Sequence, residues 1–274
     1  MGVLSNKIDR ETLKPGDHIY SWRSAWIYAH HGVYTGEGRV IHFTRAAGQE
    51  VGTGTVLDHI ILSSTTKPSG RPCDECGDQS MASGVISSCL DCFLSGGNLY
   101  LFEYGVSPAF FLAKARGGTC TLADCDPPDH VLHRALYLLE NGFGGYNIFS
   151  NNCEDFAVYC KTGLLVNNDV NMGRSGQAMS AVLAAVSAVG SSPLRFLTTN
   201  VGGLAAVGCG MYCVSRYVSD MGIRPDVIKV PVETLVNPSA VVVSTTATNQ
   251  VITETLSDNL IASDGPSVAT KKNI

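Results

Sequence analysis

Residues 28–43 read YAHHGVYTGEGRVIHF, and residues 150–156, far downstream, read SNNCEDF. The first stretch predicts a β-hairpin, because two apolar runs rich in β-branched and aromatic residues flank a glycine-rich turn. The second predicts a helix that begins near Asn152, with Cys153 in its first turn. A helix N-terminus stabilises a thiolate, and a nearby imidazole can take the thiol proton. Together the two stretches supply the minimum equipment for covalent thiol catalysis.

The hairpin contains three histidines, and the length of its loop decides which of them share a face. Neighbouring residues on a strand point to opposite faces, so His30 and His31 cannot both face Cys153. A three-residue loop over residues 36–38 puts His30 and His42 on one face, whereas a two-residue loop puts His31 with His42. The residues alone leave both registers open.

His30, His42 twelve residues later, and residues 152–156 resemble the signature of the lecithin:retinol acyltransferase domain. That family belongs to the NlpC-type, circularly permuted branch of papain-like folds, in which the histidines precede the cysteine. The layout is most similar to that of plant members, and the resemblance covers residues 13–165. The family spacing selects the register with His30 and His42 on one face. It implies that Cys153 is the nucleophile, that His30 is its general base, and that His42 orients the base.

Four other cysteines form two Cys-x-x-Cys pairs separated by twelve residues: Cys73, Cys76, Cys89 and Cys92. Two thiolate pairs at this spacing can close a tetrahedral Zn²⁺ site. Four thiolates leave no open coordination position, so we expect structural zinc that orders an insert over residues 66–97. Redox-active pairs and unrelated surface thiols are the alternatives. Short animal members of the resembled family lack such an insert, which makes it a candidate for reshaping the active-site mouth or binding a protein partner.

The remaining pattern of the chain predicts the α+β class. Residues 98–104 predict a strand, residues 131–141 predict a helix, and a further helix is expected from Asn152 to about Thr162. Helices and antiparallel strands are segregated along the chain rather than alternating. With the resemblance, the expected architecture is a permuted papain-like fold whose antiparallel sheet packs on helices, with a zinc-knuckle insert.

Net charge and the sequence toward both ends of the chain indicate which partners and which cellular compartment to expect. The net charge of −5 and the lack of a basic run argue against nucleic acid as a partner. No apolar signal-peptide core opens the sequence, so we expect a cytoplasmic protein with reduced thiols. Residues 178–217 predict an apolar helical region that either packs on the domain or contacts a membrane surface. Residues 237–274 predict a mostly disordered tail.

The favoured function is that of a thiol-dependent acyltransferase or lipid acyl hydrolase acting through a Cys153 thioester. An amine, alcohol or water would then take the acyl group. The resemblance implies a phospholipid or other lipid ester as the acyl donor. One alternative is a cysteine peptidase or amidase of the same superfold, which would turn over peptides rather than lipids. The other is a non-catalytic, zinc-stabilised interaction protein, in which Cys153 would have ordinary thiol reactivity.

Overall fold

The computed structural model describes residues 6–23, 28–45, 73–79, 81–114, 116–145, 151–166 and 201–236. The chain divides into two compact units, Met1–Val232 and Glu233–Ile274. In chain order the elements are η1 (Arg10–Thr12), β1 (His18–Arg23), β2 (Tyr28–Gly36), β3 (Arg39–Thr44), β4 (Gly84–Cys89), α2 (Leu90–Leu94), β5 (Tyr100–Leu101), α3 (Pro108–Ala113), α4 (Pro128–Asn141), α5 (Cys153–Thr162), β6 (Leu164–Val166), α7 (Val201–Val218), β7 (Val227–Lys229) and α8 (Val232–Val236). Residues 178–200 and 237–274, on which part of the predicted apolar region and the predicted tail fall, lie outside the described residues.

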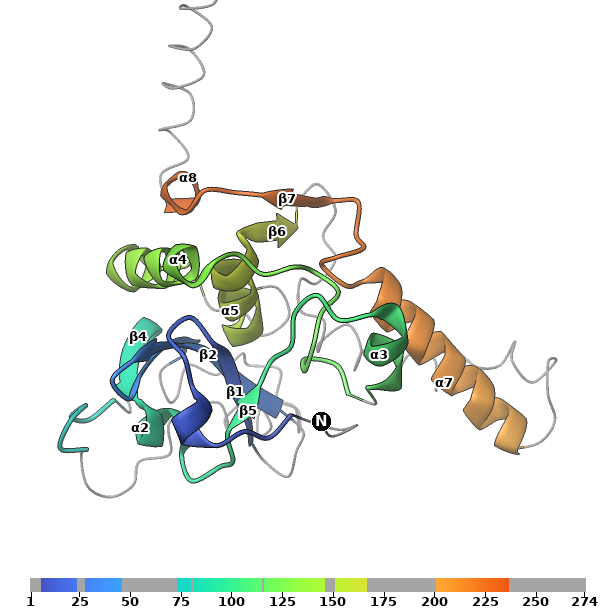
Figure 1. The fold of residues 1–274 in the computed structure, drawn as a ribbon, viewed down its shortest axis with the longest axis horizontal. Coiled ribbons are helices and arrows are strands. Elements are labelled where there is room, and N and C mark those ends of the chain that lie inside the picture. The colour runs from blue at the N-terminus through green and yellow to red at the C-terminus, as the bar shows by residue number, and fades with distance from the viewer. Residues whose placement is uncertain are drawn as a thin grey trace, which may run out of the picture. The chain divides into compact units, whose positions relative to one another are not determined.

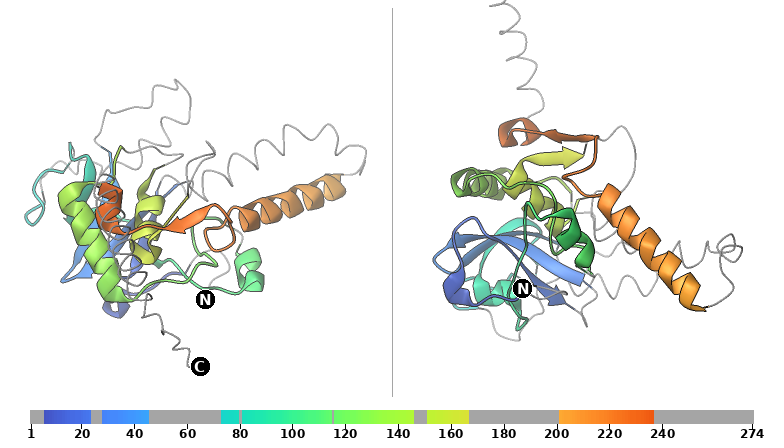
Figure 2. Two further views of the ribbon diagram at one scale, coloured as in Figure 1. Left: turned by 90° about the horizontal axis from the view of Figure 1, so that it is seen from above. Right: turned by 45° about the vertical axis from the view of Figure 1, so that its right-hand side comes forward.

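A five-stranded antiparallel sheet, in the order β4-β3-β2-β1-β5, forms the centre of the first unit. Helices α4 and α5 pack on one side of this sheet and α2 packs on the other, as Figure 1 and the right-hand view of Figure 2 show. Strands β6 and β7 pair separately. Because the sheet is antiparallel and helices cover both of its faces, the predicted α+β class is confirmed. The strand predicted over residues 98–104 is shorter than expected and is confined to Tyr100–Leu101.

The β2–β3 hairpin puts His30 and His42 on one face, as predicted, but its loop is shorter than predicted. Its loop has only two residues, Glu37 and Gly38, both with positive φ. The pairs run from Val33–Ile41 and Tyr34–Val40 to Gly36–Arg39, with a register shift between Tyr34 and Gly36. A shift of this kind adds one unpaired residue to a strand. The bulge therefore gives the two-residue loop the same parity as a three-residue loop, and His30 and His42 share a face.

Each face of the sheet has its own apolar core. On the α2 side the buried residues are Ile19, Val40, Leu90, Phe93, Leu94 and Leu99. On the α5 side they are Tyr20, Ala29, Tyr100, Phe102 and Val158. The alternation of side chains along β2 then puts Ala29 and His31 on the α5 side and His30 on the α2 side. The two hairpin histidines that are neighbours in sequence thus lie in different cores.

Helix α5 begins at Cys153, where the sequence predicts a helix start. The Asn152 side chain accepts hydrogen bonds from the backbone N–H groups of Glu154 (2.9 Å) and Asp155 (3.2 Å). The Asp155 carboxylate accepts one from the Asn152 N–H at 3.0 Å, which completes a capping box. Gly163 ends the helix with a φ of 68°, the conformation that favours glycine at this position. The first turn, which carries the thiol, is therefore tightly fixed.

Helix α7 covers the C-terminal part of the apolar helical region predicted over residues 178–217. Its C-terminal end is fastened to the body of the first unit, because the Arg216 guanidinium donates to the carbonyl oxygens of Lys114 and Phe111. Asp220, just beyond the helix, accepts from the Thr121 hydroxyl at 2.9 Å. None of the described helices is both long enough and apolar enough to cross a bilayer.

Candidate active site and cysteine cluster

The predicted nucleophile lies against the strand that carries the predicted base. Cys153 is buried, with 1% of its surface exposed. Its Sγ lies 2.7 Å from the hydroxyl of Tyr28 and 3.8 Å from the carbonyl oxygen of Ala29. Both residues stand at the start of β2, immediately before His30. Helix α5 thus delivers the thiol to the stretch of β2 that the sequence singles out.

The two predicted histidines are joined in a buried hydrogen-bonded chain. Nε2 of His30 lies 2.9 Å from Nδ1 of His42, and Nε2 of His42 lies 2.8 Å from Oγ of Ser88 on β4. All three residues are at most 3% exposed. The Phe93 ring of α2 packs against both imidazoles, at centroid distances of 5.3 and 5.5 Å. These contacts leave neither ring room to turn without breaking a buried contact.

The direction of this chain decides whether His30 can act as a base. Nδ1 of His30 is buried and has no hydrogen-bond partner in the part of the chain that the structure describes. If Ser88 accepts from His42, then His42 accepts from His30, and Nδ1 of His30 carries a lone pair. In the opposite direction that nitrogen would carry a buried N–H without an acceptor, which is the costlier arrangement. The first direction is favoured, and it leaves His30 ready to accept a proton.

Electrostatics keeps both imidazoles neutral. Burial lowers the pKa of His30 well below its usual value, and His42 and Arg23 lower it further. Burial lowers the pKa of His42 to about 3, with a smaller contribution from Arg23. A neutral His30 can take a proton at pH 7, but it holds that proton weakly. The arrangement therefore favours proton transfer in step with nucleophilic attack over a standing thiolate–imidazolium pair.

Arg23 is the cation of the site. It pairs across the sheet with Tyr28 and donates to the carbonyl oxygens of Phe93 and Leu94 at the end of α2. Burial lowers the pKa of Arg23, while negative charge on Tyr28 or Cys153 raises it. By the same reciprocity the guanidinium stabilises negative charge that develops at the thiol or on the tyrosine. Arg23 therefore stabilises the negative charge that develops when the Cys153 thiol loses its proton.

No hydrogen bond joins His30 directly to Cys153 within the described residues: Nε2 of His30 bonds to His42, and Nδ1 of His30 has no partner there. Tyr28, which touches the thiol, lies on the same face of β2 as His30. Catalytic hydrogen bonds are often long in a protein without substrate and tighten when substrate binds. The structure therefore places Cys153 against β2, the strand that carries His30, with no hydrogen bond between the two side chains.

His31, the other hairpin candidate, belongs to a second histidine pair. Its Nδ1 lies 2.8 Å from Nε2 of His18, and Nδ1 of His18 lies 2.7 Å from the Tyr104 hydroxyl. His31 is fully buried. His31 therefore does not point outward, and its partner His18 lies on the neighbouring strand β1, inside the α5-side core.

The four predicted zinc ligands meet in space. Their sulfur atoms all lie within 4.8 Å of one another, and Sγ of Cys73 is 3.8 Å from Sγ of Cys89. Tetrahedral Zn–S bonds of about 2.3 Å separate two sulfurs by about 3.8 Å, so the spacing fits. These cysteines can therefore hold a metal ion. Cys160, which lies outside this cluster, is fully buried on α5, and its burial raises its pKa.

Backbone N–H groups point at the sulfurs of the cluster. The Cys89 N–H donates to Sγ of Cys76 at 3.0 Å, and the Cys92 N–H donates to Sγ of Cys89 at 3.4 Å. Hydrogen bonds from the backbone of Glu75 and Cys76 lower the pKa of Cys73 to about 7. These donors favour the thiolate of Cys73, the form that binds a metal, whereas burial raises the pKa of Cys89 and of Cys92.

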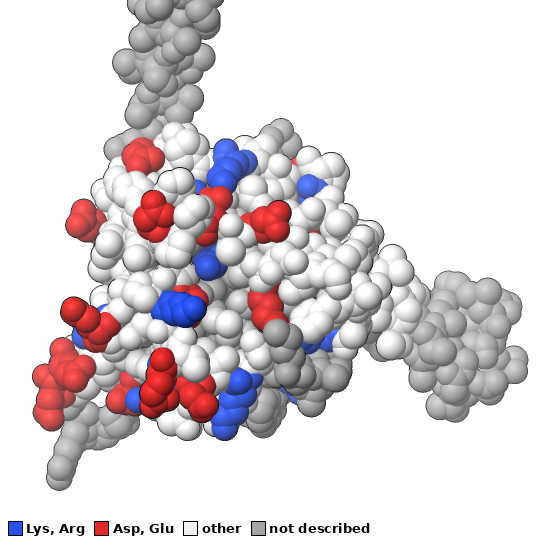
Figure 3. Space-filling model, in the orientation of Figure 1, with Lys and Arg blue, Asp and Glu red and all other residues white. Residues whose placement is uncertain are grey.

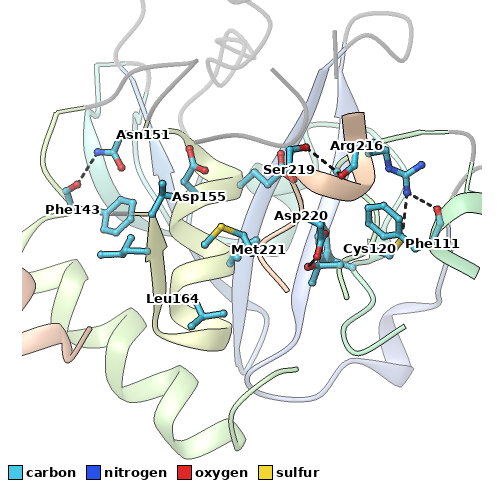
Figure 4. A pocket seen from close by; sticks show the side chains of 18 residues that line it. Phe111, Cys120, Phe143, Asn151, Asp155, Leu164, Arg216, Ser219, Asp220 and Met221 are labelled. Atoms are coloured by element: carbon cyan, nitrogen blue, oxygen red, sulfur yellow. Dashed lines mark hydrogen bonds between the residues drawn. The ribbon is translucent and has the colours of Figure 1, made fainter. Parts of the chain in front are cut away.

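A small cavity opens beside the start of α5 (Figure 4). It encloses about 50 Å³ and is lined by Glu154, Asp155 and Val158 on one side and by Arg216, Asp220 and Met221 on the other, among others. A volume of this size holds a few water molecules but not a lipid acyl chain. Cys153 is not among its lining residues, so we do not assign the cavity to the reaction.

Three residues of the site are absent from the sequence prediction: Arg23, Tyr28 and Ser88. Arg23 and Tyr28 lie at strand ends and Ser88 is the next-to-last residue of β4. Cross-strand pairing brings each of them to the cysteine or the histidines. The only sequence signal is parity, because Tyr28 stands two residues before His30 and must share its face. Ser88 could not have been found in this way, since its partner strand is set by the fold.

Two comparisons place the chain among known proteins. A family model described as Lecithin retinol acyltransferase matches residues 11–166, which include the histidine pair, the cysteine cluster and Cys153. Protein LEAD-SENSITIVE 1 of Arabidopsis thaliana is 61% identical over 235 residues, which cover 86% of this chain and 90% of that relative. The likeness to this relative therefore extends beyond the range of the family model.

Proposed function

The chain belongs to the lecithin retinol acyltransferase family, and on that premise we propose that it is a thiol-dependent acyltransferase or lipid acyl hydrolase. One observation carries the proposal: a buried thiol at a capped helix start lies against the strand of an oriented, neutral histidine. In this proposal Cys153 is the nucleophile, His30 the general base and His42 the residue that orients the base. The order along the chain, with the histidine strands β2 and β3 ahead of the cysteine helix α5, supports a circularly permuted papain-like arrangement of residues 13–165.

The reaction would run in two steps. The Cys153 sulfur attacks the carbonyl carbon of an acyl ester while Nδ1 of His30 takes the thiol proton. The tetrahedral intermediate collapses to a thioester, and the alcohol of the donor leaves with the proton from His30. In the second step an amine, an alcohol or water attacks the thioester and loses its proton to His30, which returns the free thiol.

The oxyanion of the intermediate needs hydrogen-bond donors. The backbone N–H of Cys153, at the start of α5, is the first candidate. The Tyr28 hydroxyl, 2.7 Å from the sulfur, supplies a second donor close to the reacting carbon. Arg23 adds positive charge to the same place. Removing one oxyanion donor typically costs about 10²–10³ in kcat.

Turnover of lipids against peptides tests this proposal. The protein should release or transfer acyl groups from a glycerophospholipid presented in mixed micelles, and Cys153→Ser should stop this without unfolding the chain. Cys160→Ser is a matched control on the same helix, and it should retain turnover. Cleavage of peptide or amide bonds with no lipid turnover would favour the peptidase alternative, and no turnover of either would favour the interaction protein.

We also propose that Cys73, Cys76, Cys89 and Cys92 hold a structural zinc ion. The fit of four sulfurs to tetrahedral spacing supports it, and a site closed by four thiolates supplies no open position for chemistry. Protein made in zinc-replete, reducing conditions should contain about one zinc per chain. Each ligand replaced by serine should release it, whereas Cys153→Ser should not. Elemental analysis without zinc would contradict the proposal.

The surface suggests which side meets a lipid substrate. Exposed acids surround the cysteine cluster, among them Asp74, Glu75 and Asp91, and acidic side chains gather at the lower left in Figure 3. Anionic membranes repel such a surface. Helix α7 instead exposes Met211, Val214 and Val218. We expect peripheral contact with a membrane through α7, and we expect a protein partner to bind at the acidic insert.

A further inference from the structure

We propose that the four-cysteine centre positions the histidine pair, so that the metal it holds is needed for thiol chemistry and not only for the fold of the insert. The inference rests on the proposed function for its catalytic meaning. Its structural content, that the centre fixes the orientation and tautomer of His30 and His42, can be tested without any substrate. Two routes of contact lead from the cysteines to the two imidazoles.

The first route runs through Ser88. Ser88 is the residue before the ligand Cys89, and the two side chains point to opposite faces of β4. Cys89 is held by the cluster, through its N–H to Sγ of Cys76 and through the proximity of its own sulfur to Cys73. A metal that fixes Cys89 therefore fixes the C-terminal end of β4. That strand presents Oγ of Ser88 to His42 at 2.8 Å.

The second route runs through Phe93. Helix α2 follows β4 without a gap, and Cys89 is its N-cap, with Sγ accepting from the Cys92 N–H. Five residues are too few for a helix that is stable by itself. The cluster supplies the anchor, since Cys89 and Cys92 bracket the first turn. Phe93, the residue after Cys92, is 1% exposed and packs on both His30 and His42.

The chemical consequence is the placement of a proton. With Ser88 in place as acceptor, His42 keeps its proton on Nε2 and accepts from His30 through Nδ1. His30 then has its proton on Nε2 and a lone pair on Nδ1. If β4 and α2 loosen when the metal leaves, the acceptor is lost and either tautomer of each ring becomes accessible. Ser88 is in this sense a positioning residue, and the cysteine centre holds it.

The second histidine pair provides an internal reference. His18 and His31 contact Tyr20, Phe102 and Tyr104 on the α5 side of the sheet. Loss of the metal should disturb the pair on the α2 side and leave this one in place. A general loss of structure would disturb both pairs.

Nitrogen NMR of the histidine rings, in the zinc-loaded full chain, tests the inference directly. We expect Ser88→Ala to change the tautomer signals of His30 and His42 and to leave those of His18 and His31 unchanged. It should also slow alkylation of Cys153 by iodoacetamide about tenfold, the equivalent of one buried hydrogen bond. Ser88→Thr, which keeps the hydroxyl, should restore both readouts. Ser87→Ala, on the opposite face of β4, should change neither.

The metal is tested with Cys76→Ser, since Cys76 contacts neither histidine. It should release zinc and reproduce the effects of Ser88→Ala. Unchanged His30 and His42 signals after zinc loss would overturn the inference, and so would unchanged signals in Ser88→Ala, which leaves the metal in place. If Cys76→Ser unfolds the chain, the Ser88 variants still decide. If wild-type protein forms no thioester but its signals respond as expected, the proposed function fails and the inference about the histidines stands.

Discussion

Two buried histidine pairs lie on opposite faces of one sheet, and their hydrogen-bonded chains end on different groups. The imidazole nitrogens are 2.9 Å apart in His30–His42 and 2.8 Å apart in His18–His31. Burial lowers the pKa of all four histidines. The pairs differ in what surrounds them. His18–His31 ends on the hydroxyl of Tyr104, whereas His30–His42 ends on a serine and leaves Nδ1 of His30 without a partner among the described residues.

The comparison shows that burial and a lowered pKa do not identify a catalytic histidine. Both properties follow from placing an imidazole in an apolar core. What distinguishes His30 is the direction of its hydrogen-bonded chain and the thiol, tyrosine and arginine at the start of β2. The His18–His31 pair is a polar crosslink inside the α5-side core.

The largest expected effect separates the neighbours His30 and His31. His30→Ala should lower turnover of an acyl ester by about 10²–10⁴, the usual value of a general base. His31→Ala removes the same group from the opposite face and should leave most of the turnover that the folded fraction of the protein can support. Steady-state rates, corrected for the folded fraction by circular dichroism, measure the difference. A more severe loss in His31→Ala would reverse the assignment.

A smaller effect is expected at the second member of each pair. His42→Ala should lower turnover less than His30→Ala does, because His42 orients the base without touching substrate. His18→Ala is the matched change in the other pair, and its main effect should be on stability. Measured with saturating donor, the His42 variant should lose kcat with little change in KM. A loss confined to KM would point to a role in substrate binding instead.

The sequence predicts the local features of the site better than its long-range ones. The start of α5 follows from Asn152 and its cap, and its end follows from Gly163. The four cysteines follow from their spacing, because a turn closes each pair. The bulge in β2 was not predictable, since its extra residue is absorbed only when β3 pairs with β2. Arg23 and Ser88 were missed for the same reason, as their partners lie on other strands.

The smallest expected effect is shared by the two pairs and concerns stability. Burial lowers the pKa of His31 and of His42 to about 3 in the folded protein. In the unfolded chain a histidine has its ordinary pKa of about 6.5, so below that pH the unfolded chain binds more protons than the folded one. The free energy of unfolding should therefore be highest above about pH 6.5, where the histidines are neutral in both states, and should fall as the pH drops toward 3. The slope is up to about 1.4 kcal/mol per pH unit for each histidine.

Urea unfolding at a series of pH values between about 5 and 7.5 measures this slope. His31→Gln and His42→Gln should flatten it to a similar extent, although only the second should affect turnover. If neither substitution alters the slope, the histidines are not neutral in the folded protein, and the account of both pairs is wrong.

The covalent intermediate tests the central claim most directly. The protein is incubated with mixed glycerophospholipids, quenched in acid and analysed by intact mass. We predict a mass increase equal to one acyl group on wild-type protein, removed by neutral hydroxylamine as a thioester is, and absent from Cys153→Ala. Wild-type protein that gains no acyl group, or a Cys153→Ala variant that gains the same hydroxylamine-sensitive group, would contradict the claim that Cys153 is the nucleophile of an acyl-transfer site.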